Sequence, residues 1–369
     1  MLRSVNAAIG RPDGWDGAIN AVAPPGRWVS VKGETSMTRK SKLLSAVAAS
    51  AMAFGAQAAL ADGHLEEITV AYFLEWPTPN QYAQTNGIYD EELGVKVNWV
   101  SFDAGTAMSA AMASGDVHIS FSQGVTPFLV ATAAGQDLQI VDVAVSYSDN
   151  DNCVVRSELE ITAENASELE GKEVGVPLGT MAHSGFLTQM AHFGVDVDSM
   201  KIVDMAPVDS AAAFANGSLD MVCGWGGPLR RMKEYGNPLL EGQEKEDVVG
   251  KVFDVTSVPT EFAEENPELL AKFLAVTAKM NAQYASDPDS MIGDIATAAG
   301  MDEEGTKAVI GTFRFPDVAT QLSDSWMGGG LVDFLAASAA SLEESGQLTA
   351  LEDYAPLVNS SYLEAASEM

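Results

Sequence analysis

Two stretches of this sequence align with each other without a gap. "AAMASGDVHISFSQG" (110–124) matches "AAFANGSLDMVCGWG" (212–226) at an offset of 102 residues. Each contains the end of a helix, a Gly that suits the left-handed C-cap conformation, an apolar strand and a Gly-containing loop. Ligands of open α/β sheets bind beyond the carboxyl ends of the strands. The repeat therefore predicts two lobes of one design, which present Gln123 and Trp225 to a common cleft.

Strand-like and Ala-rich helical runs alternate around this repeat. A β-α-β-α order is typical of α/β proteins, in which helices cover the faces of a mostly parallel sheet. After residue 261 the sequence is mostly helical, with apolar residues at spacings of three and four. The expected strands are 67–74, 95–102, 118–121, 138–147, 173–177, 201–205 and 221–225, and the expected helices are 81–93, 105–114, 127–134, 181–193, 208–216 and 228–235.

The segment 37–61 has the three parts of a secretory signal peptide. A basic start is followed by an Ala-rich apolar run and by an A-x-A cleavage site that ends at Ala61. Small residues dominate the run and no stop-transfer charges follow it, which disfavours a membrane anchor. We therefore expect the mature protein to be 62–369, exported and soluble, and residues 1–36 to be a non-native upstream extension.

Residues 62–369 contain 13 Lys or Arg and 49 Asp or Glu, which gives a net charge of −36. Such acidity argues against nucleic acid as a partner and disfavours an anionic membrane surface. The four His are scattered and no C-x-x-C or H-E-x-x-H motif is present, so we expect no metal site and no cofactor. Cys153 and Cys223 can pair in an oxidising compartment, although separate buried thiols are the more common outcome in a protein of this size.

Four longer segments carry a family resemblance. They are "FDAGTAMSAAMASGDVHIS" (102–120), "LEGKEVGVPLGTMAHSGFL" (169–187), "GWGGP" (224–228) and "VFDVTSVPTEFAEENPELLAKFL" (252–274). These segments resemble those of the periplasmic solute-binding proteins of ABC importers, in the taurine, aliphatic sulfonate and nitrate group. The resemblance covers residues 65–369, and within the group the sequence looks most like the taurine-binding proteins.

This resemblance implies a two-lobed α/β periplasmic binding protein, type II-like, with a mixed, mostly parallel sheet in each lobe and a hinge of two crossover strands. Lobe 1 is expected to comprise 62–151 plus 254–369, and lobe 2 to comprise 154–250. The family relationship further implies a monomeric, periplasmic protein without enzymatic activity. It would close its interlobe cleft on a small aminosulfonate such as taurine and deliver it to the membrane permease and ATPase of an ABC importer.

An aminosulfonate is a zwitterion, and its ammonium group requires a carboxylate, an aromatic face or both. Asp254 matches an Asp of the family that the resemblance assigns to binding the ligand's amine. Its apolar sequence neighbours argue against the alternative, a solvated acid in a loop. Trp225 lies among glycines that leave its ring uncovered. The resemblance therefore assigns Trp225 to a wall of the pocket, with simple core packing as the alternative.

The sulfonate requires a positive pole, and helix N-termini supply partial positive charge. Thr180 is expected to cap one such helix and also to bind the ligand. His183, one turn further, matches the family's His, with packing on the helix face as the alternative. The facing N-terminus follows Gln123. Arg230 and Arg231 are better explained as surface residues than as ligand contacts.

"FLEWP" (73–77) is where the sequence departs from the family pattern, because the taurine-binding proteins have smaller polar residues there. Trp76 is expected to face Trp225 across the cleft. Glu75 either joins Asp254 at the ammonium group or lies at the rim of the pocket. Altered ligand specificity is expected to originate in this loop.

Asn80 and Gln81 begin the next helix and are expected to add polar contacts to the ligand. The additional acid and Trp would suit a larger amine or a quaternary ammonium. Another small amine, a sulfonate, nitrate or a pyrimidine also stay open as ligands. A desulfinase-like enzyme on the same fold would use Cys223 as its nucleophile, although no base that would lower its pKa lies near it in the sequence.

Overall fold

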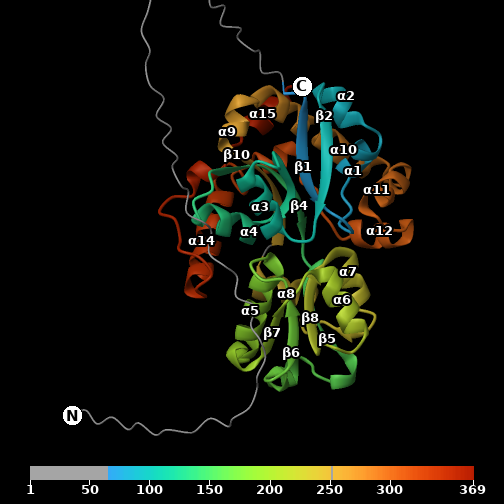
Figure 1. The fold of residues 1–369 in the computed structure, drawn as a ribbon, viewed down its shortest axis with the longest axis vertical. Coiled ribbons are helices and arrows are strands. Elements are labelled where there is room, and N and C mark those ends of the chain that lie inside the picture. The colour runs from blue at the N-terminus through green and yellow to red at the C-terminus, as the bar shows by residue number, and fades with distance from the viewer. Residues whose placement is uncertain (1–64, 251) are drawn as a thin grey trace, which may run out of the picture. The chain divides into compact units, whose positions relative to one another are not determined.

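Two five-stranded sheets organise the residues that the computed structural model describes, 65–250 and 252–369 (Figure 1). These residues belong to one unit, Asp62–Met369. We use "first lobe" for the sheet that contains the chain's first strand, with its helices, and "second lobe" for the other. The first sheet contains β1 (Glu67–Phe73), β2 (Lys96–Phe102), β3 (Ile119–Gly124), β4 (Leu138–Tyr147) and β10 (Val252–Pro259). The second sheet contains β5 (Asp151–Arg156), β6 (Glu173–Val176), β7 (Lys201–Asp204), β8 (Met221–Trp225) and β9 (Gly236–Asn237).

The two sheets have the same plan. Their strand orders are β2-β1-β3-β10-β4 and β7-β6-β8-β5-β9. In each sheet the first three strands are parallel and the fourth is antiparallel to the third. The strands of the sequence repeat, β3 and β8, occupy the same third place. The predicted fold class of two lobes with mixed, mostly parallel sheets is therefore confirmed.

The chain crosses between the sheets twice. It leaves the first sheet after β4, enters the second at β5, and returns to the first at β10. The chain enters β5 after the first crossing and β10 after the second. Each of these strands is antiparallel to the third strand of its own sheet, and the two crossings form the expected hinge. The precise lobe limits expected from the sequence, 62–151 plus 254–369 and 154–250, stay a prediction.

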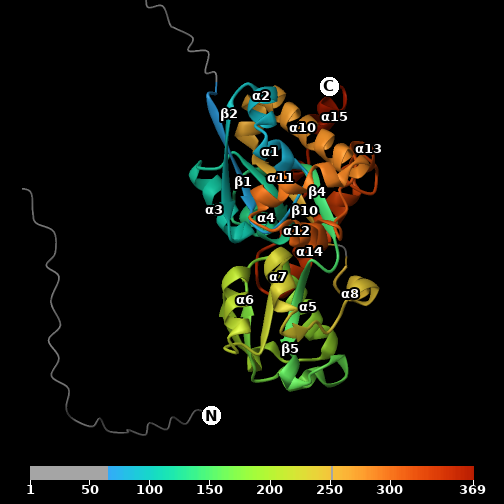
Figure 2. The same ribbon diagram turned by 90° about the vertical axis from the view of Figure 1, so that its right-hand side faces the viewer.

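Helices cover both faces of each sheet, and Figure 2 shows α3 and α10 on opposite faces of β1 and β2. The first lobe has α1 (Asn80–Thr85), α2 (Ile88–Leu93), α3 (Gly105–Ser114) and α4 (Val125–Ala133), and later α9 (Thr260–Glu265), α10 (Pro267–Ser286), α11 (Ile292–Ala299), α12 (Glu303–Ile310), α13 (Val318–Gln321), α14 (Gly330–Glu344) and α15 (Ser361–Ser367). The second lobe has α5 (Met181–Phe193), α6 (Pro207–Ala215), α7 (Gly226–Met232) and α8 (Gly242–Val249).

Buried apolar side chains explain why the lobes are separate. One continuous cluster fills the first lobe, from Ile68 on β1 to Ala366 on α15. Two smaller clusters lie in the second lobe; one contains Phe186 and the other Phe214.

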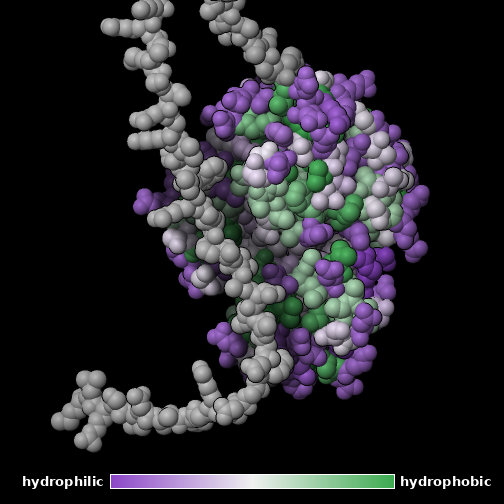
Figure 3. Space-filling view, viewed as in Figure 1, coloured by the Kyte–Doolittle hydropathy of each residue, from purple (hydrophilic) through white to green (hydrophobic). Residues whose placement is uncertain are grey.

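On the surface, hydrophilic side chains gather along the outer rim in Figure 3, and the paler patch over α3 reflects its exposed alanines.

Two local predictions require correction. The helix expected at 81–93 is divided into α1 and α2, because Gly87 between them has a φ of 66° that a continuous helix does not allow. Cys153 and Cys223 lie opposite each other on the antiparallel strands β5 and β8 and form a disulfide, so separate thiols were the wrong expectation.

The expected signal peptide (37–61) and upstream extension (1–36) lie outside the described residues. Among the residues that the structure describes, no helix is both long enough and apolar enough to span a bilayer.

Candidate functional site: an aromatic cavity with two carboxylates

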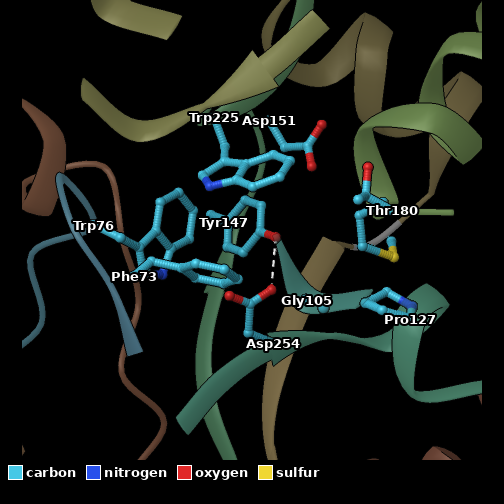
Figure 4. Close-up of a pocket in the computed structure, with 11 residues that line it drawn as sticks. Phe73, Trp76, Gly105, Pro127, Tyr147, Asp151, Thr180, Trp225 and Asp254 are labelled. Atoms are coloured by element: carbon cyan, nitrogen blue, oxygen red, sulfur yellow. Dashed lines mark hydrogen bonds between the residues drawn. The ribbon is translucent and has the colours of Figure 1, made fainter. Parts of the chain in front are cut away.

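A cavity lies between the lobes, where strand ends of both sheets and the starts of three helices meet (Figure 4). Its position beyond the strand ends is the usual place for a ligand in an open α/β sheet. The lining residues are Phe73, Trp76, Gly105, Gly124, Pro127, Tyr147, Asp151, Thr180, Met181, Trp225 and Asp254.

Asp254, on β10, is the carboxylate of the first lobe. Its Oδ1 accepts a hydrogen bond from the Tyr147 hydroxyl at 2.8 Å, and its Oδ2 accepts one from the Ser122 hydroxyl at 2.8 Å. Burial raises the pKa of Asp254 to about 7, and the negative charge of Asp151 adds to this, while the two hydrogen bonds act in the opposite direction. A positive ligand group would therefore find a buried carboxylate with little compensating charge.

Ser122 connects Asp254 to the aromatic wall. The Trp76 indole N–H donates to the Ser122 hydroxyl at 2.9 Å, and that hydroxyl donates to Asp254. Ser122 has a φ of 58°, a left-handed conformation that is unfavourable for a residue with a side chain. Such strain often occurs at functional sites, where the surrounding structure holds the residue in place.

Asp151, the first residue of β5, is the carboxylate of the second lobe. Burial raises its pKa to about 7, and the positive charge of Lys245 opposes this rise. The Lys245 ammonium group donates to the main-chain oxygens of Ser148 and Asp151, and so fixes the crossing between the lobes. Figure 4 shows Asp151 beside Trp225, away from Asp254 on the other side of the Tyr147 ring.

Four aromatic rings line the cavity beside these acids. Trp76 packs edge-on against Tyr147 with ring centroids 5.0 Å apart, and it also contacts Phe313 at 4.4 Å. Trp225 of the second lobe contacts Phe73 of the first lobe at 5.8 Å. Aromatic faces attract cations. Rings and carboxylates together form an environment suited to an ammonium group.

The opposite part of the cavity is formed by helix N-termini. Gly105 begins α3, Gly124 precedes α4, and Thr180 precedes α5. The helices α3 and α4 lack side-chain caps, whereas Thr180 accepts the His183 N–H and caps α5. N-termini carry partial positive charge and bind anions through main-chain N–H groups. Among the described lining residues none is Arg or Lys, so these N-termini are the positive element of the wall.

Glycine is required at two of these helix starts. A Cβ on Gly105 would collide with Pro127, and a Cβ on Gly124 would collide with Met181. The lack of a side chain at Gly105 lets α3 and α4 approach each other within the first lobe, and its lack at Gly124 lets α4 approach α5 of the second lobe. No cluster of potential metal ligands occurs among the described residues.

The structure brings four predicted site residues together at the cavity: Trp76, Thr180, Trp225 and Asp254. Trp76 and Trp225 both line the cavity. The first-lobe ring that contacts Trp225, however, is that of Phe73. The role of these residues as ligand contacts stays a prediction.

Glu75 does not join Asp254. Its carboxylate forms a two-pronged ion pair with Arg231 on α7 of the second lobe, and its main-chain oxygen accepts the Gly227 N–H at 2.9 Å. Glycine is needed at 226 and 227 because a Cβ at either position would collide with Glu75. Glu75 therefore bridges the lobes beside the cavity, and Arg231 is its partner rather than a free surface residue.

Four other predicted residues are engaged in structural contacts and do not line the cavity. The Gln81 side chain accepts the Thr78 N–H and donates to the Trp76 carbonyl, while the Asn80 side chain accepts from the Thr78 hydroxyl. Both hold the loop after β1. The remaining two are Gln123, whose amide donates to the Gly105 carbonyl at 2.6 Å, and His183, whose ring nitrogen accepts the Gly179 N–H.

His183 lies at the start of α5. Burial lowers the pKa of its imidazole, while the nearby Gln347 side chain and the charge of Asp204 act in the opposite direction. A neutral imidazole does not supply the positive pole that an anion requires. Its observed contacts thus favour the packing alternative.

Sequence reasoning missed Phe73, Tyr147 and Asp151. Phe73 and Tyr147 are the last residues of β1 and β4, and Asp151 is the first of β5. Phe73 and Tyr147 could have been found, because both lie at or next to the end of a strand that the sequence predicted. Asp151 lacked such a signal because β5 itself was not predicted.

Comparisons with known proteins agree with this architecture. The taurine-binding periplasmic protein of Escherichia coli (strain K12) is 26% identical over 337 residues, which cover 89% of this chain and 99% of that protein. The alkanesulfonate-binding protein SsuA from Xanthomonas axonopodis pv. citri, solved with bound MOPS, has a TM-score of 0.66 at 18% identity and covers 80% of this chain and 99% of its own.

The same fold also carries an enzyme. The desulfurization enzyme DSZB has a TM-score of 0.59 at 14% identity and covers 82% of this chain and 99% of its own. The family model described as NMT1/THI5 like matches residues 78–291. Because this match includes more than half of the chain, and because the predicted resemblance to taurine- and sulfonate-binding proteins is confirmed, the chain belongs to the NMT1/THI5-like family.

Proposed function

We propose that this protein is the periplasmic substrate-binding component of an ABC importer, and that it binds a small aminosulfonate such as taurine. The observation that carries the proposal is a cavity with two unlike poles. Asp151 and Asp254 lie among aromatic rings on one side, and three helix N-termini meet on the other. A zwitterion with an ammonium and a sulfonate group complements both poles.

The ligand would be captured by closure of the lobes. The cavity is formed by residues of both lobes, for example Asp254 from the first and Trp225 from the second. Hinge motion about the two crossings would open it to solvent, and the bound ligand would favour the closed form because it contacts both walls. The closed, monomeric protein would then deliver its ligand to a membrane permease and its ATPase. The similarity to taurine- and alkanesulfonate-binding proteins supports this scheme.

We propose binding without catalysis. The one candidate nucleophile of a desulfinase-like reaction was Cys223, and its sulfur is bonded to Cys153 in the structure. A thiolate is the reactive form of cysteine, and a disulfide sulfur supplies none.

Calorimetric titration of the protein with taurine tests the proposal, together with a thermal-shift measurement on the same sample. A ligand that binds the folded state raises stability by RT ln(1 + [L]/Kd), about 2.7 kcal/mol at 100 times Kd. We expect saturable heat and a higher melting temperature. Absence of both at millimolar taurine would exclude this ligand, and unchanged taurine after long incubation checks that no reaction occurs.

A further inference from the structure

Asp151 has a carboxylate at the cavity that accepts no hydrogen bond from a described residue. The residue is 6% exposed, and its side chain lines the cavity. Asp254 across the cavity accepts hydrogen bonds from Tyr147 and Ser122, but no described residue donates one to the Asp151 carboxylate. A buried charged group without a partner is strongly unfavourable. The cavity's contents, water or a ligand, are therefore left to supply the donor.

The charges around Asp151 do not replace that donor. The Lys245 ammonium group lies close enough to oppose the rise in the pKa of Asp151, but its hydrogen bonds go to main-chain oxygens. The other charged or titratable groups that act on this part of the cavity are Asp254, a like charge, and Tyr147, whose pKa is raised by its own burial so that it stays neutral. The site therefore has an excess of negative charge.

We infer that Asp151 is a second ligand-binding carboxylate, and that Asp151 and Asp254 together select ligands with a positively charged N–H group. The inference rests on the proposed function in one respect, that the ligand occupies this cavity. It goes further because it excludes ligands that are only anionic, such as unsubstituted alkanesulfonates and nitrate.

The chemistry of both partners supports this selection. An ionised carboxylate offers about four acceptor positions, and Asp254 uses two of them for Tyr147 and Ser122. A primary ammonium group has three donors, enough to reach both acids, while the rings of Trp225 and Trp76 attract its charge. A simple anion would instead face two carboxylates in a wall that, among the described residues, contains no Arg or Lys.

Four two-carbon ligands separate the contribution of each end. Taurine has ammonium and sulfonate, isethionate has hydroxyl and sulfonate, ethanolamine has ammonium and hydroxyl, and ethylene glycol has two hydroxyls. Calorimetric titration of the protein with each, in the same buffer at pH 8, compares ammonium with hydroxyl at a constant opposite end. Since a hydrogen bond to a charged group contributes about 1.5–3 kcal/mol, we expect taurine to bind about 10- to 100-fold more tightly than isethionate.

The variant Asp151→Asn tests the residue itself. It should weaken taurine binding about 10-fold or more, because it removes a hydrogen bond to a charged group. Isethionate binding should be unchanged or stronger. The control is Asp209→Asn, which removes an equal charge from an exposed position on α6. It should change either affinity by no more than about twofold, as expected for a surface substitution. If Asp151→Asn does not fold, Asp151→Ser takes its place with the same expected results, and the ligand series on the unaltered protein still tests the ammonium selection.

The outcomes distinguish the two proposals. If isethionate binds as tightly as taurine, the inference about charge is wrong and the sulfonate-binding function stands. If ethanolamine binds as tightly as taurine while isethionate does not bind, the sulfonate function is wrong and the ammonium selection stands. Taurine affinity that survives Asp151→Asn unchanged would overturn the role of Asp151, and no binding of any of the four would overturn both.

Discussion

Replacing Glu75 with Gln should weaken the closed state, because Glu75 joins the two lobes in two ways. Its carboxylate pairs with Arg231 through both guanidinium nitrogens, one of them at 3.2 Å. Its main-chain oxygen accepts the Gly227 N–H, and this second contact does not depend on the side chain. The substitution therefore removes the charge of the bridge and keeps its main-chain part.

The magnitude follows from the exposure of the pair. The side chain of Arg231 is 38% exposed and that of Glu75 is 21% exposed. Exposed ion pairs contribute about 0.2–1 kcal/mol, whereas hydrogen bonds to charged groups contribute about 1.5–3 kcal/mol. For a partly exposed pair we expect a coupling of about 1 kcal/mol after allowing for solvent screening. Because the pair forms only when the lobes meet, this corresponds to about fivefold weaker ligand binding.

A double-mutant cycle measures this coupling. Taurine affinity is determined by calorimetry for the unaltered protein, Glu75→Gln, Arg231→Gln and the double variant. Each single variant should bind taurine about fivefold more weakly than the unaltered protein. The double variant should bind as weakly as either single variant, because the coupling of about 1 kcal/mol is already lost in each of them. The matched control is Lys233→Gln, which removes a positive charge at the end of the same helix but pairs with Glu241 within the second lobe.

Two results would contradict this reasoning. Independent single effects that multiply to about 25-fold in the double variant would show that the residues do not act as a pair. A control variant as weak as Arg231→Gln would assign the effect to net charge. Added salt should narrow the difference between the unaltered protein and Glu75→Gln, because ions screen partly exposed charges over about 10 Å at 0.1 M.

Three further predictions concern stability and closure. The pKa of Asp254 is raised to about 7, so the folded state holds a proton there between about pH 4 and 7 that the unfolded state releases. Its contribution to stability therefore falls as pH rises through that window, by at most about 1.4 kcal/mol per pH unit. In urea unfolding, Asp254→Asn should gain about 2.6 kcal/mol of stability relative to the unaltered protein between pH 5 and pH 8, and a constant difference would contradict the buried-acid assignment. Reducing the disulfide between Cys153 and Cys223, which are 70 residues apart, should lower the free energy of unfolding by about 2–4 kcal/mol, and equal urea midpoints with and without reductant would show that it adds nothing. Gly227→Ala should give a larger radius of gyration by solution scattering in the presence of taurine, because its Cβ would collide with Glu75; a radius equal to that of the unaltered protein would mean that the lobes adjust without opening.

Local sequence signals were sufficient for most of the elements. The helices at 105–114 and 181–193 and the strands at 138–147 and 221–225 have the predicted bounds, because glycine C-caps and changes of apolar period mark them directly. The aligned repeat indicated two lobes of one plan, and the sheets have matching strand orders.

The sequence by itself thus determined the α/β alternation and the two-lobed plan, and it placed Trp76 just after a strand, Trp225 at a strand end and Thr180 at a helix start. Each of these follows from residues close to one another in the chain, whereas Asp254, which lies inside β10, was inferred from the family resemblance.

Only the tertiary structure decided which distant residues meet. Cys153 pairs with Cys223 because the register of β5 on β8 places them opposite each other, and β5 has no strong pattern of its own. Glu75 meets Arg231 across 156 positions only because the lobes come together. Asp151 lines the cavity for the same reason, because the chain passes the cavity as it crosses from β4 to β5, and no local sequence pattern marks where a chain will cross between lobes.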